Sequence, residues 1–197
     1  MEGNTRMTDA KLAEGVFDIA NEVMGHIVNV VKDDQLIHYE PSRHLVAFEQ
    51  TYQDELLIAD HLKERLARHD PIEHDIEQYR HDGDMELTEE QMSALRMVLD
   101  NDVCMLNGQA GSGKSSTTKA ILDMLDDLEK RYVCLTPTGI SSKILRQYTG
   151  RPASTIHMFL TNVWHPDYVL IDESSMVSVH LLAVLLSQIG YEPKLIF

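Results

Sequence analysis

The second half of the chain shows a regular alternation of apolar patterns. From residue 84 onward, short apolar runs typical of buried strands alternate with stretches in which apolar residues recur every three or four positions. Such alternation predicts a parallel sheet whose strands are joined by crossover helices. The predicted strands cover 103–106, 132–135, 168–171 and 194–197, and the predicted helices cover 89–99, 114–128, 141–148 and 178–188. We therefore expect an α/β domain over residues 84–197.

The first 83 residues have a different pattern. Helical spacing of apolar residues predicts one helix over residues 9–31 and another over residues 50–68. Two short apolar stretches between these helices predict a hairpin over residues 36–48. Residues 69–84 are charged and poor in apolar side chains, which indicates a connector. We expect a small, mostly helical accessory region that ends at residue 83.

Composition narrows the class of protein. Hydrophobic residues make up 43% of the chain, enough to bury a core. The longest apolar run, Leu181–Leu186, is far shorter than the roughly 20 residues that span a bilayer, so we expect no membrane partner. Cys104 and Cys134 each lie in a predicted strand, which favours buried thiols in a reducing compartment over a disulfide. These features predict a cytoplasmic protein.

The charge distribution is uneven. A formal net charge of −15 disfavours a nucleic-acid partner, because phosphates are bound by Lys and Arg. Between residues 130 and 166, however, there is no acidic residue. This window contains Lys130, Arg131, Lys143, Arg146 and Arg151. The window indicates either a basic surface or merely a solvated helix face.

A glycine-rich segment follows the predicted strand 103–106 and precedes the helix 114–128. It fits the phosphate-binding loop G-x-x-x-x-G-K-[ST], known as the P-loop. Its residues are Gly108, Gln109, Ala110, Gly111, Ser112, Gly113, Lys114 and Ser115, followed by Ser116. The glycines let backbone N–H groups surround phosphate oxygens, and the helix N-terminus adds partial positive charge. We expect ATP there, with Lys114 on the β- and γ-phosphates and Ser115 on Mg²⁺.

Two further segments bear on the same site. Asp172 and Glu173 follow the strand 168–171, at the edge where parallel sheets bind ligands. Asp172 is suited to hold Mg²⁺, and Glu173 to deprotonate the attacking water, which indicates hydrolysis. Gln91 follows Thr88 by three residues and has two readings: a capping-box partner of Thr88, or a side chain that recognises the adenine edge.

Polar turns in the basic window suggest contacts to a nucleic-acid backbone. Thr138 ends one predicted strand, and Thr155 and His157 lie before the next; hydroxyls and a neutral imidazole suit phosphodiester oxygens. A plain turn and a helix cap are the alternatives. Trp164 could stack on a base, although ordinary packing is the stronger interpretation.

Five segments carry a family resemblance: LTEEQMSAL, LNGQAGSGKSS, LTPTGISSKIL, STIHMFL and LIDESSM. Their order resembles the first motor domain of superfamily 1B DNA helicases, in particular the RecD-like and Dda-like branches. The resemblance implies that Gln91 reads adenine and that Lys114 and Ser115 hold phosphates and Mg²⁺. It further implies that Asp172 is the metal partner and Glu173 the base, and that Thr138, Thr155 and His157 lie along single-stranded DNA. From the charge of the basic window, we expect Lys143, Arg146 and Arg151 to give weak, salt-sensitive binding to single-stranded DNA.

The resemblance also carries differences and an expected function. Ile140 stands where the family usually has a basic residue, and the chain stops before the remainder of the motor, including the second domain with its arginine finger. We expect ATP hydrolysis coupled to 5′-to-3′ movement on single-stranded DNA, with other replication or recombination proteins as further partners. One alternative is a nucleotide-binding module that docks on a partner without turning over ATP. A small-molecule kinase is disfavoured, because the Asp172–Glu173 pair beside the metal and the segment Thr155–His157 suit a translocase better.

Overall fold

The computed structural model describes residues 6–8, 11, 14, 37–40, 42–82, 85–108 and 113–197. They belong to two compact units that divide between Ile58 and Ala59. In the described part of the first unit, an antiparallel sheet has the order β1-β3-β2. Its strands are β1 (Arg6–Thr8), β2 (Ile37–Glu40) and β3 (Leu45–Phe48). The pairing of β2 with β3 confirms the predicted hairpin.

Helix α3 (Glu49–Leu66) begins directly after β3 and confirms the helix predicted over residues 50–68. Its residues from Ala59 onward belong to the second unit. The helix predicted over residues 9–31 lies outside the described residues except at Lys11 and Glu14, which are helical.

The second unit contains a parallel sheet whose described strands have the order β6-β10-β9-β7-β8. The strands are β6 (Val103–Cys104), β7 (Tyr132–Thr136), β8 (Ala153–Thr155), β9 (Tyr168–Ile171) and β10 (Lys194–Ile196). The helices are α4 (Glu89–Asp100), α5 (Lys114–Asp127), α6 (Gly139–Thr149), α7 (Ile156–Leu160) and α8 (Val179–Ile189). This alternation confirms the predicted α/β P-loop class of fold.

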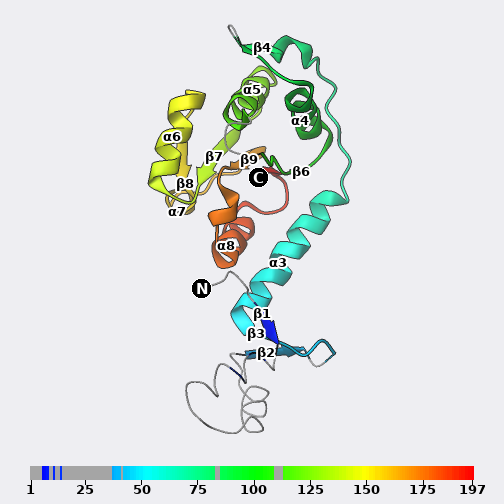
Figure 1. The fold of residues 1–197 in the computed structure, drawn as a ribbon, viewed down its shortest axis with the longest axis vertical. Helices are drawn as coiled ribbons and strands as arrows, with labels where there is room; N and C mark the ends of the chain where they lie inside the picture. The colour runs from blue at the N-terminus through cyan, green and yellow to red at the C-terminus, as the bar shows by residue number, and fades with distance from the viewer. Residues whose placement is uncertain are drawn as a thin grey trace. The chain divides into compact units, whose positions relative to one another are not determined.

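Strand β9 lies between two hydrophobic layers. Its residues Tyr168 and Leu170 belong to a core cluster with residues of α4, α5 and α6. Val169 and Ile171 are equally buried and point to the other face, because side chains alternate along a strand. Figure 1 shows α8 on the opposite side of the sheet from α4 and α5. The apolar sequence of β9 follows from this burial on both faces, and it delivers Asp172 to the carboxyl edge of the sheet.

The predicted connector is partly packed onto the second unit. Its residues form the 3-10 turn η1 (Glu77–Tyr79) and the strand β4 (His81–Asp82), which pairs with β5 (Met85–Glu86). Ile76 and Tyr79 are buried in the same cluster as Leu87 and α4. The division between compact units therefore falls earlier, inside α3, than the domain boundary that the sequence predicts at residues 83 and 84.

The last turns of α3 hold the loop that precedes β10. Arg65 is fully buried, and its guanidinium donates to the carbonyl oxygens of Pro193 at 2.8 Å and Gly190 at 2.6 Å. The ring of His61 stacks on that of Tyr191 with centroids 4.0 Å apart. These contacts satisfy a buried cation by backbone oxygens and fix the start of β10.

Candidate nucleotide site and nucleic-acid interface

The phosphate-binding segment is described on both sides of its turn. Gly113 is the N-cap of α5 and has a φ of +80°, a conformation that disfavours any side chain. Lys114, Ser115 and Ser116 are the first residues of α5, whose opening N–H groups have no partner within the helix. Gly108 is exposed after β6, and residues 109–112 lie outside the described residues. A helix N-terminus therefore faces the site, as an anion-binding loop requires.

Gln91 joins α4 to this segment. Its side-chain oxygen accepts from the Thr88 N–H at 2.8 Å, and the Thr88 hydroxyl accepts from the Gln91 N–H at 3.3 Å. The amide Nε2 donates to the Gly113 carbonyl oxygen at 3.1 Å. The capping-box interpretation is confirmed, and the same side chain touches the loop. Recognition of adenine by Gln91 stays a prediction.

Lys114 and Asp172 approach each other from α5 and from the end of β9. The lysine Nζ lies 3.5 Å from Asp172 Oδ1. The backbone N–H of Asp172 donates to the Leu135 carbonyl oxygen at 2.9 Å, and the Tyr148 hydroxyl donates to Asp172 Oδ2 at 3.2 Å. Burial and the neighbouring Asp172 carboxylate raise the pKa of Tyr148, so this hydroxyl remains a donor. The carboxylate is thus held in place beside the lysine.

Two cavities adjoin Lys114. One has a volume of about 510 Å³ and is lined by Lys114, Asp172 and Glu173 among others. The second has a volume of about 480 Å³ and is lined by Gln91, Gly108 and Lys114 among others. Met105, Leu106 and Asn107 border both cavities. The arrangement suits an elongated ligand with its anionic part at Lys114 and its two ends in different cavities.

Glu173 has an unusual backbone and a specific partner. Its φ of +55° lies in the left-handed region, which is uncommon for a residue with a side chain and is often found at functional sites. One carboxylate oxygen accepts a hydrogen bond from the Ser141 hydroxyl. Ser141 is buried near the start of α6, so Glu173 is tied to the helix that follows β7.

The threonines predicted to contact DNA both cap helices. Thr138 is the N-cap of α6 and accepts from the Ser141 N–H, and Thr155 is the N-cap of α7 and accepts from the Met158 N–H. They lie at the carboxyl ends of the neighbouring strands β7 and β8, where Thr136 is in register with Thr155. The cap interpretation is confirmed, and the structure brings both threonines to one sheet edge. His157 is exposed on α7.

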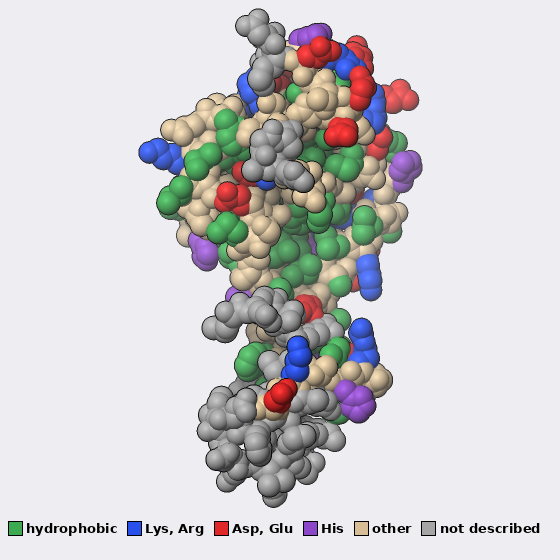
Figure 2. Space-filling model, in the orientation of Figure 1, with side chains coloured by type: hydrophobic (Ala, Val, Ile, Leu, Met, Phe, Trp, Pro, Cys, Tyr) green, Lys and Arg blue, Asp and Glu red, His purple; other side chains and the backbone are tan. Residues whose placement is uncertain are grey.

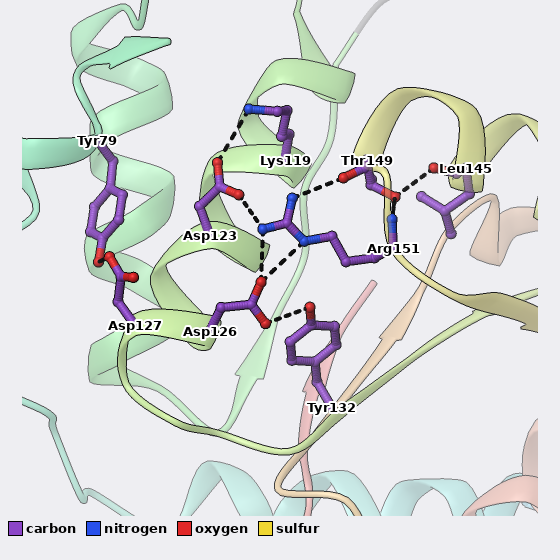
Figure 3. A network of polar contacts seen from close by, with 9 residues as sticks. All are labelled: Tyr79, Lys119, Asp123, Asp126, Asp127, Tyr132, Leu145, Thr149 and Arg151. Atoms are coloured by element: carbon purple, nitrogen blue, oxygen red, sulfur yellow. Dashed lines mark hydrogen bonds and ion pairs between the residues drawn. The ribbon is translucent and has the colours of Figure 1, made fainter.

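In the fold, carboxylates neutralise part of the positive charge of the basic window. Arg131 pairs with Asp167 at 2.8 Å. Arg151 pairs with Asp123 and, at 2.7 Å, with Asp126, both on α5 (Figure 3). The expectation that Arg151 offers free charge is therefore wrong, because these carboxylates lie outside the window in sequence but beside Arg151 in the fold. In Figure 2, acidic and basic side chains are mixed at the end of the second unit that carries α4 and α5.

Two window residues keep their charge available. Lys143 and Arg146 are exposed on α6, and no ion pair joins either to a carboxylate among the residues that the structure describes. Arg146 donates to the Ser142 carbonyl oxygen at 3.3 Å, a contact that leaves its charge uncompensated. A basic surface on α6 is thus limited to these two side chains.

Three site residues were not predicted from sequence. Tyr148 and Ser141 hold Asp172 and Glu173, and Thr118 lines the larger cavity beside Lys114. In the sequence, the spacing of seven residues from Ser141 to Tyr148 was the one signal that could have identified these two residues, since it places both side chains on one face of α6.

Trp164 packs edge-to-face against Phe159, with ring centroids 6.5 Å apart, while 41% of the Trp164 residue is exposed.

Comparison with known proteins gives one family and several relatives. Residues 86–196 match the model of the AAA domain family. The chain is 35% identical to the ATP-dependent RecD2 DNA helicase of Deinococcus radiodurans over 114 residues, which are 52% of this chain and 16% of that protein. It is 31% identical to the ATP-dependent DNA helicase Dda of Enterobacteria phage T4 over 109 residues, 51% of this chain and 25% of Dda.

A third relative is the RecBCD enzyme subunit RecD of Mycolicibacterium smegmatis, 26% identical over 145 residues. That match covers 55% of this chain and 26% of the relative. In each of these relatives the match spans about a quarter of the protein or less. The family match falls on the segment that contains the loop before α5, the Lys114–Asp172 pair and the caps of α6 and α7. The chain therefore belongs to the AAA domain family, and its residues 86–196 are similar to the motor region of superfamily 1B helicases of the RecD-like and Dda-like kind.

Proposed function

We propose that this chain is the ATP-binding motor portion of a DNA helicase that couples ATP hydrolysis to movement on single-stranded DNA. The observation that carries the proposal is the Lys114–Asp172 pair, which lines the larger cavity together with Glu173. Nucleotide binding alone needs no acidic residue next to the lysine. A carboxylate pair at that place supports hydrolysis. The resemblance to superfamily 1B supports the 5′-to-3′ direction.

The residues have separate roles in this proposal. Gln91 meets the adenine edge in the smaller cavity, and the turn from Gly108 to Gly113, with Gln109, Ala110, Gly111 and Ser112, surrounds the phosphates. Lys114 neutralises the β- and γ-phosphates, and Ser116 adds a hydroxyl in the first turn of α5. Glu173 takes the proton of the attacking water.

Magnesium fits the side chains present. The Ser115 hydroxyl and the Asp172 carboxylate are the hard oxygen donors that Mg²⁺ prefers. Asp172 Oδ1 faces Lys114 at 3.5 Å, longer than a hydrogen bond, so lone pairs of this oxygen remain for a cation or its water. The bound cation would offset the negative charge of the γ-phosphate.

The proposal extends to the rest of the chain. Residues 84–197 would form the motor domain, and the start of the family match at residue 86 supports this boundary. Residues 1–83 would form an accessory region, whose part from Ala59 onward belongs to the same compact unit as the motor domain. Buried free thiols at Cys104 and Cys134, whose pKa values burial raises to about 11 and about 12, support a reducing, cytoplasmic location. Replication or recombination proteins remain proposed partners.

The DNA-binding part is tested by fluorescence anisotropy with an oligothymidylate. We expect weak binding by the 197-residue chain, with a log–log salt slope of about −1.4 if about two phosphates are neutralised. Lys143→Ala and Arg146→Ala should each flatten the slope by about 0.7. Arg151→Ala is the matched control and should leave the slope unchanged, because its charge is already compensated by Asp123 and Asp126. Absence of binding at low salt would favour a nucleotide-binding module that docks on a protein partner.

A further inference from the structure

Three side chains form a line of hydrogen bonds from the α6 N-terminus to Glu173. The hydroxyl oxygens of Thr138 and Ser141 lie 2.8 Å apart, and the Ser141 hydroxyl donates to Glu173 Oε2. Ser141 is 7% exposed, so water competes weakly for its hydroxyl. The line joins a proposed DNA contact to the proposed base.

The number of available protons decides which hydroxyl donates in each hydrogen bond of this line. A hydroxyl has one proton, and an ionised carboxylate only accepts. Because Ser141 gives its proton to Glu173, the short contact between the two hydroxyls requires Thr138 to donate to Ser141. Thr138 can do so while it caps α6, since the cap uses a lone pair of its oxygen to accept from the Ser141 N–H at 3.2 Å.

A DNA phosphate competes for the same proton. Phosphodiester oxygens only accept hydrogen bonds, so a phosphate on the Thr138 hydroxyl takes the proton that otherwise goes to Ser141. The two hydroxyl oxygens, 2.8 Å apart, can then share a hydrogen bond only if Ser141 turns its own proton toward Thr138 and away from Glu173. We propose that Ser141 is a positioning residue that makes DNA contact at Thr138 and the hold on Glu173 mutually exclusive. This inference rests on the proposed function, because it needs Thr138 to contact DNA and Glu173 to act as the base.

Release of Glu173 has a clear consequence. Glu173 lines the larger cavity together with Lys114 and Asp172, and its backbone already has the left-handed conformation. Once it is released from Ser141, the Glu173 side chain can move within that cavity by rotation about its own bonds, without a change in the backbone. DNA at Thr138 therefore loosens the base at the ATP site, which couples the two ligands through two hydroxyl groups.

The test measures oligothymidylate affinity by anisotropy in the 197-residue chain. Ser141→Ala frees the Thr138 proton for phosphate and should tighten DNA binding about fivefold, within the range for the net contribution of one typical hydrogen bond. Ser141→Thr keeps a hydroxyl and should restore the original affinity. The matched control is Ser142→Ala, which removes a buried hydroxyl of the same helix that donates to the Gly139 carbonyl oxygen instead. It should leave DNA affinity unchanged.

A second variant tests the line from its other end. Glu173→Ala removes the acceptor, so Ser141 can donate to Thr138 and the Thr138 proton is freed as well. This change also removes a negative charge, and the charge effect is measured separately in the Ser141→Ala background, where the line is already broken. We expect Glu173→Ala to tighten DNA binding more in the original chain than in that background.

The outcomes separate the inference from the proposed function. Equal affinities of Ser141→Ala and the original chain, or equal gains from Glu173→Ala in both backgrounds, would overturn the inference while DNA binding itself stands. A gain from Ser142→Ala as large as that from Ser141→Ala would also overturn it, since the effect would then come from loosening α6. Failure of the original chain to bind any oligothymidylate would overturn both.

Discussion

At the scale of single residues, the chemistry depends most on Glu173. Its side chain is tied to Ser141, its backbone is left-handed, and it follows the carboxylate that faces Lys114. These features put the proposed base next to the proposed phosphates without giving it a role in binding them. The roles of Asp172 and Glu173 are therefore separable by mutation.

Glu173→Gln keeps the shape of the side chain and removes its ability to take a proton. In a longer protein that joins this chain to a second motor domain of the family, ATP should still bind while turnover falls by roughly 10²–10⁴. Calorimetry measures ATP binding, and phosphate release measures turnover. Near-normal phosphate release would mean that another group deprotonates the water.

His61 gives a pH-dependent contribution to stability. Burial, together with the neighbouring Arg65, lowers the pKa of this imidazole below its ordinary 6.5. The Arg65 guanidinium donates to Nδ1 at 3.2 Å, a contact that needs an unprotonated nitrogen there. Below about pH 6.5 the unfolded chain takes up a proton that the folded chain resists.

The free energy of unfolding should consequently fall as the pH drops from about 7.5 to about 5.5. His61→Phe keeps a ring against Tyr191 and removes the titrating group. The free energy of unfolding of this variant should therefore fall less over the same pH range. Urea unfolding at the two pH values measures both chains. An equal fall in the free energy of unfolding of both chains would show that His61 does not cause the pH dependence.

At the scale of elements, the start of α5 is where local conformation and ligand binding meet. Gly113 has a φ of +80°, and a Cβ added there would lie 2.4 Å from Gln91 Nε2. Gly150, the C-cap of α6, has a φ of +70° and nothing within 4 Å of such a Cβ. The two glycines share a backbone conformation and differ in their surroundings.

Replacing each glycine by alanine separates these effects. Both variants should lose about 1 kcal/mol of stability because an L-residue is disfavoured at positive φ. Only Gly113→Ala should also weaken Mg·ATP binding, because its methyl group displaces Gln91 from the loop. Urea unfolding and calorimetric titration give the two quantities. A similar loss of ATP affinity in Gly150→Ala would show that the clash at Gln91 is not the cause.

Elements with strong apolar patterns were predictable from sequence, and polar ones were not. Strand β9 and helix α8 are apolar enough to be recognised directly. Strand β8 contains only Ala153, Ser154 and Thr155, and it exists because it pairs with β7 at the sheet edge. Helix α7 has five residues, too few for a helical repeat to be visible. Both arise from tertiary pairing that a local pattern does not contain.

The candidate site divides in the same way. The loop before α5 and the Asp172–Glu173 pair were predictable, because their spacing relative to strands and helices is local. The bond from Ser141 to Glu173 joins residues 32 positions apart, and the pairing of Arg151 with Asp123 spans 28 positions. A count of charges along a window cannot detect such partners, which is why the basic window was overestimated.

At the scale of the whole molecule, the second unit has two proposed ligands, ATP and single-stranded DNA. No helix among the described residues is long and apolar enough to cross a membrane. The formal charge of −15 would repel DNA from most of the surface, so a favourable approach depends on α6, where Lys143 and Arg146 remain uncompensated. In the proposed function the nucleotide, by contrast, is held by a loop, a helix N-terminus and one lysine.

Calorimetric titration of Mg·ATP into the 197-residue chain tests whether this region binds ATP through Lys114. Lys114→Ala should weaken binding at least about tenfold, which corresponds to about 1.4 kcal/mol. Lys119→Ala removes a lysine from the same helix, where it pairs with Asp123 at 3.3 Å, and should leave the affinity unchanged. Equal affinity of the original chain and Lys114→Ala would contradict the assignment of the nucleotide site.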